Sequence, residues 1–137
     1  MNTRCVVVAD GARARILVFR PDFDAPGGRT FVEHETLINP ELAMPTHERW
    51  SAGRSEARGH VQGHWYGFDD HREKHDADVE RRFAAEVVES ARQLARGIGA
   101  KEMIFVADPR MLGFSRPAFV DIEKAGIAIR THARDIS

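Results

Sequence analysis

The chain has little of what marks an exported, disulfide-linked or membrane-spanning protein. Its 137 residues include one cysteine, Cys5, so an internal disulfide cannot form and the reducing cytoplasm is the expected setting. Met1–Arg4 leads into a short apolar run, far below the length of a signal sequence or a membrane span. We therefore expect a cytoplasmic protein without membrane association, and its length predicts a single domain over residues 1–137.

The sequence also lacks an excess of charge of either sign. It has 20 lysines and arginines and 21 aspartates and glutamates, which gives a formal net charge of -1. Any contact with nucleic acid must therefore come from a local patch and not from a generally basic surface. Internal repeats are missing too. Because the sequence has neither a Ser-His-Asp order nor a glycine-rich phosphate loop, a nucleophilic hydrolase or a nucleotide-binding enzyme has no positive support.

Residues 79–109 hold the clearest helix, and it runs directly into the clearest buried strand. At about 100° per residue, apolar side chains recur on one face of the helix and charged ones occupy the others. Gly97 and Gly99 supply the stop expected just past a helix C-terminus. The apolar run Met103–Ala107 follows and ends at Asp108-Pro109, where a strand cannot continue. This arrangement predicts a strand near the middle of a sheet, covered by the helix.

Three strands are predicted ahead of this unit. Cys5–Ala9 is apolar and β-branched, and the Asp10-Gly11 dipeptide after it favours a tight turn. Arg13–Phe19 alternates in part between charged and apolar residues, which predicts a hairpin with the first strand. Phe31–Ile38 alternates weakly and carries the charged residues typical of an edge strand.

The remaining elements are a long loop, a helix start and a C-terminal helix and strand. Residues 39–69 have no sustained period and are predicted as a loop, which at that length is usually functional. The spacing of Asp70 and Glu73 fits a capping box, so the long helix is predicted to begin near His71, with Asp76 as the alternative. After the central strand we expect a loop over 108–114, a helix over 117–125 and a strand over 127–131. The fold class is α/β, a βββαβαβ mixed sheet with helices packed on it.

Four strings in the chain span most of the sequence, and the first and last are moderately specific together. They are Val6-Val7-Val8-Ala9-Asp10-Gly11-Ala12-Arg13-Ala14, Gly53-Arg54, Glu80-Arg81-Arg82-Phe83-Ala84-Ala85-Glu86-Val87 and Val106-Ala107-Asp108-Pro109-Arg110-Met111-Leu112-Gly113. These strings resemble the bacterial host-attachment protein family, named for a requirement in attachment to host cells.

That family in turn is similar to the middle domain of archaeal and eukaryotic class 1 release factors. The resemblance implies an RNase H-like core and a functional loop between the third strand and the long helix. In release factors this loop carries a Gly-Gly-Gln tip that promotes peptidyl-tRNA hydrolysis. Here the loop reads Gly59-His60-Val61-Gln62-Gly63-His64, which keeps a glutamine but not the adjacent glycine pair. The resemblance therefore implies the fold and a functional loop, and leaves the hydrolytic activity open.

Cations and aromatic residues coincide in one stretch, residues 47–75. Such a mixture can contact phosphates and stack on unpaired bases, so it predicts contact with RNA or the ribosome. Nearby carboxylates almost cancel the positive charge of this stretch. Three alternatives therefore stay open: a loop whose tryptophans fold back onto the core, a contact with another protein, and a homodimer. The candidate contact residues are Arg54, Arg58, His60, Gln62, His64, Trp65 and Arg110.

Two pairs of side chains are candidate metal ligands. His71 and His75 are four residues apart and would share one helix face, as zinc ligands often do. Asp10 and Asp108 each follow an apolar strand, and in an RNase H-like sheet these strands would be parallel neighbours, so the pair could hold Mg²⁺. The alternatives are a solvated or partner-facing helix surface for the histidines, and turn and capping roles for the aspartates.

Three functional hypotheses follow from these patterns. The leading one is a cytoplasmic, release-factor-like binding module of the host-attachment family that contacts RNA or the ribosome and needs no cofactor. The second is a metal-dependent hydrolase or nuclease that uses Zn²⁺ or Mg²⁺ at the candidate ligands. The third is an adhesion factor, against which the missing export signal argues.

Overall fold

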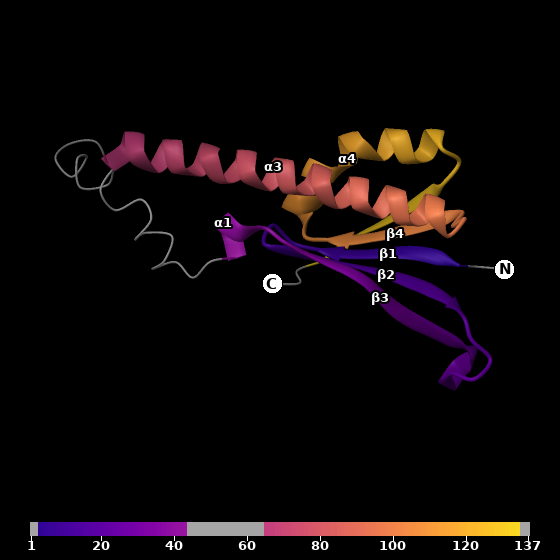
Figure 1. Cartoon of the computed structure of the whole chain (residues 1–137). Coiled ribbons are helices and arrows are strands. Elements are labelled where there is room, and N and C mark those ends of the chain that lie inside the picture. The colour runs from indigo at the N-terminus through magenta and orange to yellow at the C-terminus, as the bar shows by residue number, and fades with distance from the viewer. Residues whose placement is uncertain (1–2, 44–64, 135–137) are drawn as a thin grey trace.

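A computed structural model of the chain describes residues 3–43 and 65–134, and only the backbone for Ala43 and residues 65–73. The strands form one five-stranded sheet in the order β3-β2-β1-β4-β5 (Figure 1). β1 is antiparallel to β2 and parallel to β4, β2 is antiparallel to β3, and β4 is parallel to β5. The strands are β1 Arg4–Ala9, β2 Arg13–Pro21, β3 Arg29–Ile38, β4 Glu102–Ala107 and β5 Ala128–Ala133. The predicted mixed α/β sheet is confirmed, and strand ends lie within about two residues of those predicted.

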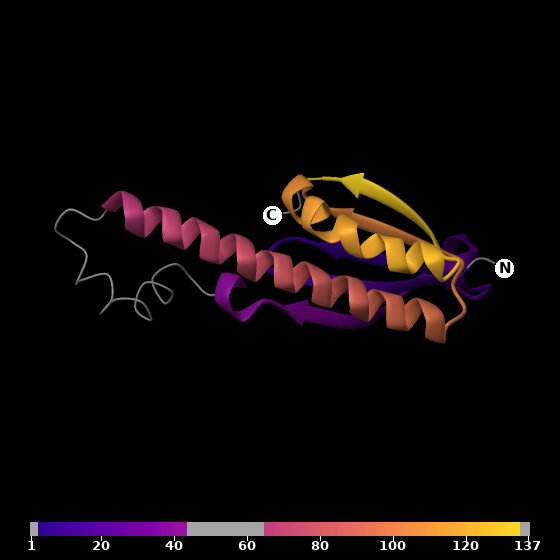
Figure 2. The same cartoon turned by 90° about the horizontal axis from the view of Figure 1, so that it is seen from above.

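Two helices lie on the same face of this sheet, α3 (Trp65–Gly97) and α4 (Pro109–Lys124), as Figures 1 and 2 show. β4 lies inside the sheet, between β1 and the edge strand β5, and its inward side chains are fully buried, as expected for a buried strand. The helix that covers β4 is not the predicted one, because α4 packs against β4 and β5 whereas α3 packs mainly against β1. Both helices thus share one apolar layer with the sheet. No helix in the described ranges is both long and apolar enough to cross a membrane.

Cys5 offers a direct test of the packing of α3 on β1. Its Sγ is buried and donates to the carbonyl oxygen of Ala91 in α3 at 3.8 Å. Burial raises the pKa of the Cys5 thiol to about 12, so the thiol stays protonated at pH 8. We expect a thiol reagent to label the folded protein only through transient opening, and the protein in guanidinium at once, with glutathione as the reagent control. Rapid labelling without denaturant would contradict this packing.

The start of the long helix differs from the prediction. α3 begins at Trp65, so the predicted starts near His71 and Asp76 are both wrong. The first turns of α3 project past the sheet (Figure 1), where no apolar stripe is needed and the periodic signal is therefore absent. The predicted loop over 39–69 also contains a short helix, α1 (Pro40–Ala43). Residues 44–64 lie outside the described residues.

The second helix also begins earlier than predicted. The predicted loop over 108–114 and helix start at Pro117 are wrong, because α4 begins at Pro109. Asp108 is its N-cap, and Pro109 occupies the first helical position, where a missing N–H has no cost. Pro117 lies inside the helix at an exposed position, where solvent can reach the carbonyl that a proline leaves unbonded. A 3₁₀ turn, η1 (Pro26–Gly28), joins β2 to β3.

Candidate functional site

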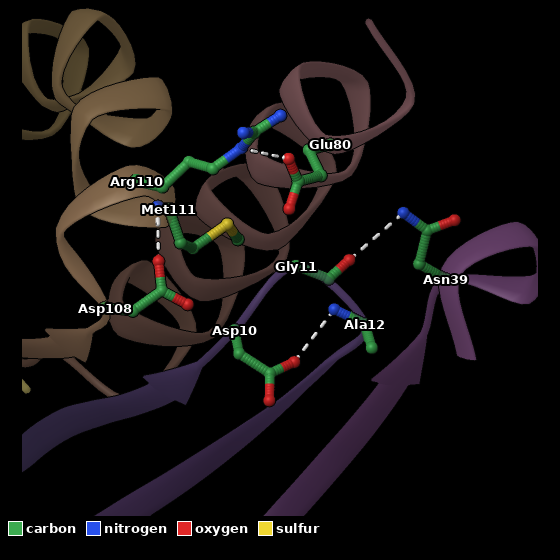
Figure 3. Close-up of polar contacts among 8 residues, drawn as sticks. All are labelled: Asp10, Gly11, Ala12, Asn39, Glu80, Asp108, Arg110 and Met111. Atoms are coloured by element: carbon green, nitrogen blue, oxygen red, sulfur yellow. Dashed lines mark hydrogen bonds and ion pairs between the residues drawn. The ribbon is translucent and has the colours of Figure 1, made fainter. Parts of the chain in front are cut away.

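The carboxyl ends of β1 and β4 lie side by side at one edge of the sheet. Ala9 pairs with Ala107 in this parallel ladder, so Asp10 and Asp108 both follow at the same edge, as predicted. Such an edge, where the chain leaves neighbouring strands in different directions, is where ligands commonly bind in α/β sheets. Figure 3 shows the two carboxylates below Glu80, which comes from α3. We call this region the carboxyl edge.

Asp10 organises the turn that joins β1 to β2. Its Oδ1 accepts hydrogen bonds from the backbone N–H of Ala12 at 2.8 Å and of Arg13 at 2.9 Å. Its own N–H donates to the carbonyl oxygen of Arg13 at 2.9 Å. An aspartate bonded in this way fixes a tight turn, which is the structural alternative that the sequence left open for this residue.

Asp108 has a comparable structural role at the start of α4. Its Oδ1 accepts from the backbone N–H of Met111 at 2.8 Å, as an N-cap does. No group of three metal-ligating side chains occurs in the part of the chain that the structure describes. The Asp10 and Asp108 pair is therefore not joined there by the third ligand that a metal-dependent hydrolase would use.

The candidate zinc pair lies in α3. Nothing is described of the His71 side chain, whereas the His75 side chain is exposed and has a defined neighbour. Its Nε2 lies 2.8 Å from Oε2 of Glu41 in α1. This contact ties α1 to α3, and the exposed position of His75 fits the solvated helix surface that the sequence allowed as an alternative to a metal site.

Glu80 and Arg110 join the two helices above the turn. Arg110 Nε donates to Glu80 Oε2, which links α4 to α3 (Figure 3). The Glu80 side chain is only 17% exposed and that of Arg110 is 56% exposed. At Gly11, an added Cβ would stand 2.1 Å from Glu80 Oε1, so the carboxylate lies where a larger residue would have to displace it. Glycine at this position thus allows α3 to come close to the turn.

Asn39 holds the turn from the other side. It is buried, and its Nδ2 donates to the carbonyl oxygen of Gly11 at 3.2 Å (Figure 3). Its backbone N–H donates to the carbonyl oxygen of Ala12 at 2.8 Å. The end of β3 and the start of α1 are therefore fixed to the same turn. No pattern in the sequence assigned Asn39 or Glu80 to this site, and the available indication of a close approach to the turn was the glycine that follows Asp10.

Two arginines, one from α3 and one from α4, lie over the same aromatic ring near this edge. The guanidinium carbons of Arg81 and Arg110 lie 5.1 and 5.5 Å from the ring centroid of Phe114. Arg81 also contacts Asp78, through Nη1 and Oδ1 at 2.7 Å. Guanidinium groups that lie over an aromatic ring are a common arrangement where a protein contacts phosphates and bases.

The predicted contact residues divide into those that can be placed and those that cannot. Arg110 lies at the carboxyl edge with Asp10 and Asp108, where it contacts Glu80 (Figure 3). Trp65 is the first residue of α3, and nothing is described of its side chain. The candidates that lie outside the described residues are Arg54, Arg58, His60, Gln62 and His64.

These features define the protein as an α/β domain with βββαβαβ order, both long helices on one face and a charged carboxyl edge. The chain belongs to the family described as "Protein required for attachment to host cells", whose model matches residues 5–128. The family resemblance of the four sequence strings is thereby confirmed.

Further comparison gives a distant structural likeness. No curated protein matches the chain. Among solved structures, the chain is similar to the type II variant of the Aquifex aeolicus Ppx/GppA phosphatase, with a TM-score of 0.48 and 8% sequence identity. The match covers 98% of this chain and 37% of that one, so the chain spans little more than a third of that structure's length.

Proposed function

We propose that the protein is a cytoplasmic, release-factor-like binding module of the host-attachment family that contacts RNA on the ribosome. Its contact surface would be residues 47–75 together with Arg110. The observation that carries this proposal is the position of the elements on either side of residues 44–64. Both α1 and the N-terminal part of α3 lie at the end of the molecule where the carboxyl edge lies (Figure 1).

The geometry of α1 and α3 supports this surface. α1 starts directly after Asn39, which is bonded to the Gly11 turn, and the contact between His75 and Glu41 connects it to α3. α1 and α3 are therefore connected at the end of the molecule where the carboxyl edge lies. Loops carried by a rigid scaffold are where binding residues are commonly found.

The chemistry of this end supports an RNA partner. The sequence of 47–75 is rich in cations and aromatic residues, and the described residues add Arg81 and Arg110 on the ring of Phe114. Arginines supply phosphate contacts, and aromatic rings stack on unpaired bases. A reaction has less support, because the two aspartates of the edge are bonded to backbone N–H groups in a turn and a helix cap.

Ribosome co-sedimentation over a range of salt concentrations tests this function. The variant Arg54→Gln with Arg58→Gln should bind ribosomes more weakly and reduce the slope of log affinity against log salt by roughly two units, because two phosphate contacts are lost. Arg20→Gln with Arg96→Gln removes the same charge elsewhere and should leave the slope unchanged. Absence of association at both low and high salt would refute the RNA function.

A glutamine variant tests in the same assay whether Gln62 contributes to ribosome binding. Gln62→Ala is expected to sediment with ribosomes as the wild type does, because a loop without the glycine pair lacks the freedom to enter a crowded catalytic centre. A loss of ribosome association in this variant would give Gln62 a direct binding role and contradict this expectation.

The family description favours a second candidate, direct contact with a host surface. The two candidates differ in where the protein must be. An adhesion factor is accessible from outside, so protease added to intact cells would remove it, whereas a ribosome-bound module would be cut only after lysis. Complete digestion in intact cells would favour adhesion over the proposed function.

A further inference from the structure

We propose that the sheet face opposite α3 and α4 binds single-stranded RNA. Bases would stack at Phe19 and Phe31, and phosphates would follow a band of arginines across the strands. This surface, which we call the open face, differs from the carboxyl edge and does not involve residues 47–75. The inference therefore goes beyond the proposed function and can fail without it.

The strand pairings define the open face. Val6 pairs with Leu17 of β2 and with Ile104 of β4, and Val8 stands beside Val106 of β4. These side chains alternate along the strands with the core side chains that meet the helices. In the described ranges both long helices lie on the other side of the sheet (Figure 1), so the open face carries an apolar strip without a helical cover.

Charges around this strip are predominantly positive. Within the described strands, Glu33 and Glu102 are its carboxylates, and arginines contact both of them. Arg15 Nε lies 3.0 Å from Glu33 Oε1. Arg4 Nε lies 3.2 Å from Glu102 Oε1, and Arg130 Nε lies 3.6 Å from the same atom. The register places these arginines on the open face: Arg4, Arg13, Arg15, Arg29 and Arg130. The face is therefore cationic although the whole chain has a net charge of -1.

Two aromatic rings lie at one corner of the open face. Phe19 of β2 and Phe31 of β3 are cross-strand partners with ring centroids 4.8 Å apart. The guanidinium carbons of Arg4 and Arg29 lie 5.8 and 5.9 Å from the Phe19 centroid. Phe31 is 59% exposed. Phe19 beside it is half-buried. An exposed ring on a sheet, with arginines near it, forms the kind of platform on which unpaired bases stack.

Charge distinguishes RNA from the other natural occupant, a second copy of the chain. Two identical open faces would bring the same excess of arginines together, and like charges across an interface are unfavourable. A polyanion complements that excess instead. A single strand fits better than a duplex, because a duplex keeps its bases stacked on one another and cannot offer them to Phe31.

Fluorescence anisotropy with a labelled uridine 12-mer tests the proposal. Phe31→Ala should weaken binding by about tenfold, because a base loses its stacking partner, and Phe31→Trp should retain it. Arg29→Gln with Arg130→Gln should reduce the salt slope by roughly 1.4 units, as expected for two phosphate contacts on a single strand. Arg96→Gln with Lys124→Gln, on the helical side, should bind as the wild type does. Equal thermal midpoints establish that each variant is folded.

Three results would overturn this inference. One is no binding of the 12-mer at low salt, and another is equal binding of a duplex of the same length. The third is a dimer in sedimentation velocity that Phe31→Ala dissociates, since the face would then bind a second copy. Arg54→Gln with Arg58→Gln separates the two proposals: it should bind ribosomes more weakly and bind the 12-mer as the wild type does. If it lost the 12-mer while Phe31→Ala kept it, the open-face inference would be wrong and the proposed function would stand.

Discussion

Phe105→Ala is expected to lower the free energy of unfolding by about 4 kcal/mol, the range measured when large core side chains are truncated. Phe105 is 0% exposed at the centre of β4. Its ring meets the edge of Phe119 in α4, with centroids 5.1 Å apart and an interplanar angle of 66°. Truncation would leave a cavity between the sheet and α4 and remove this aromatic contact.

Urea unfolding followed by circular dichroism measures this loss. Val120→Ala provides the matched control, because Val120 lies on the same helix but is 50% exposed, and its truncation should cost about 0.5 kcal/mol or less. Phe105→Leu keeps most of the volume and should fall between the two. A loss below about 1 kcal/mol for Phe105→Ala would mean that α4 does not pack on β4 as described.

The positions of the strands along the chain could be predicted because each strand carries a local signal. Cys5–Ala9 and Met103–Ala107 are apolar runs bounded by turn residues, and a helix that ends in glycines connects the second run to the chain before it. The starts of the helices were harder to predict from the sequence. Pro109 and Pro117 give the same first-turn signal, and only the bond from Met111 to Asp108 decides between them.

The site was predictable only in part for a similar reason. Parallel neighbours bring Asp10 and Asp108 to one edge, as the RNase H-like resemblance implied. Glu80 and Asn39 reach the same edge from α3 and from the end of β3, and their positions depend on how far each element is rotated and advanced over the sheet. Sequence periodicity gives the buried face of a helix, but not which of its polar residues meets a particular turn.

The ion pair of Glu80 and Arg110 is expected to stabilise the carboxyl edge more than a surface pair would. In a double-mutant cycle with alanine at both positions, we expect a coupling energy of about 2 kcal/mol. Glu80 is 17% exposed and lies against Gly11, so without Arg110 its charge would remain in a poorly solvated place. Such a pair therefore costs more to break than to remove as a whole.

The pair of Asp78 and Arg81 is the matched control, because it also joins a carboxylate to an arginine, within α3, with side chains 58% and 56% exposed. Its coupling should be about 0.5 kcal/mol or less, and salt should reduce it further. The Glu80 coupling should persist in salt, since its carboxylate is largely shielded from solvent. If the two couplings were equal, the contact between α3 and α4 would be an ordinary solvated pair, and Arg110 would be held by the ring of Phe114 alone. Arg110 would then be free to move away from the turn, and the carboxyl edge would lose the fixed cation on which its proposed RNA contact depends.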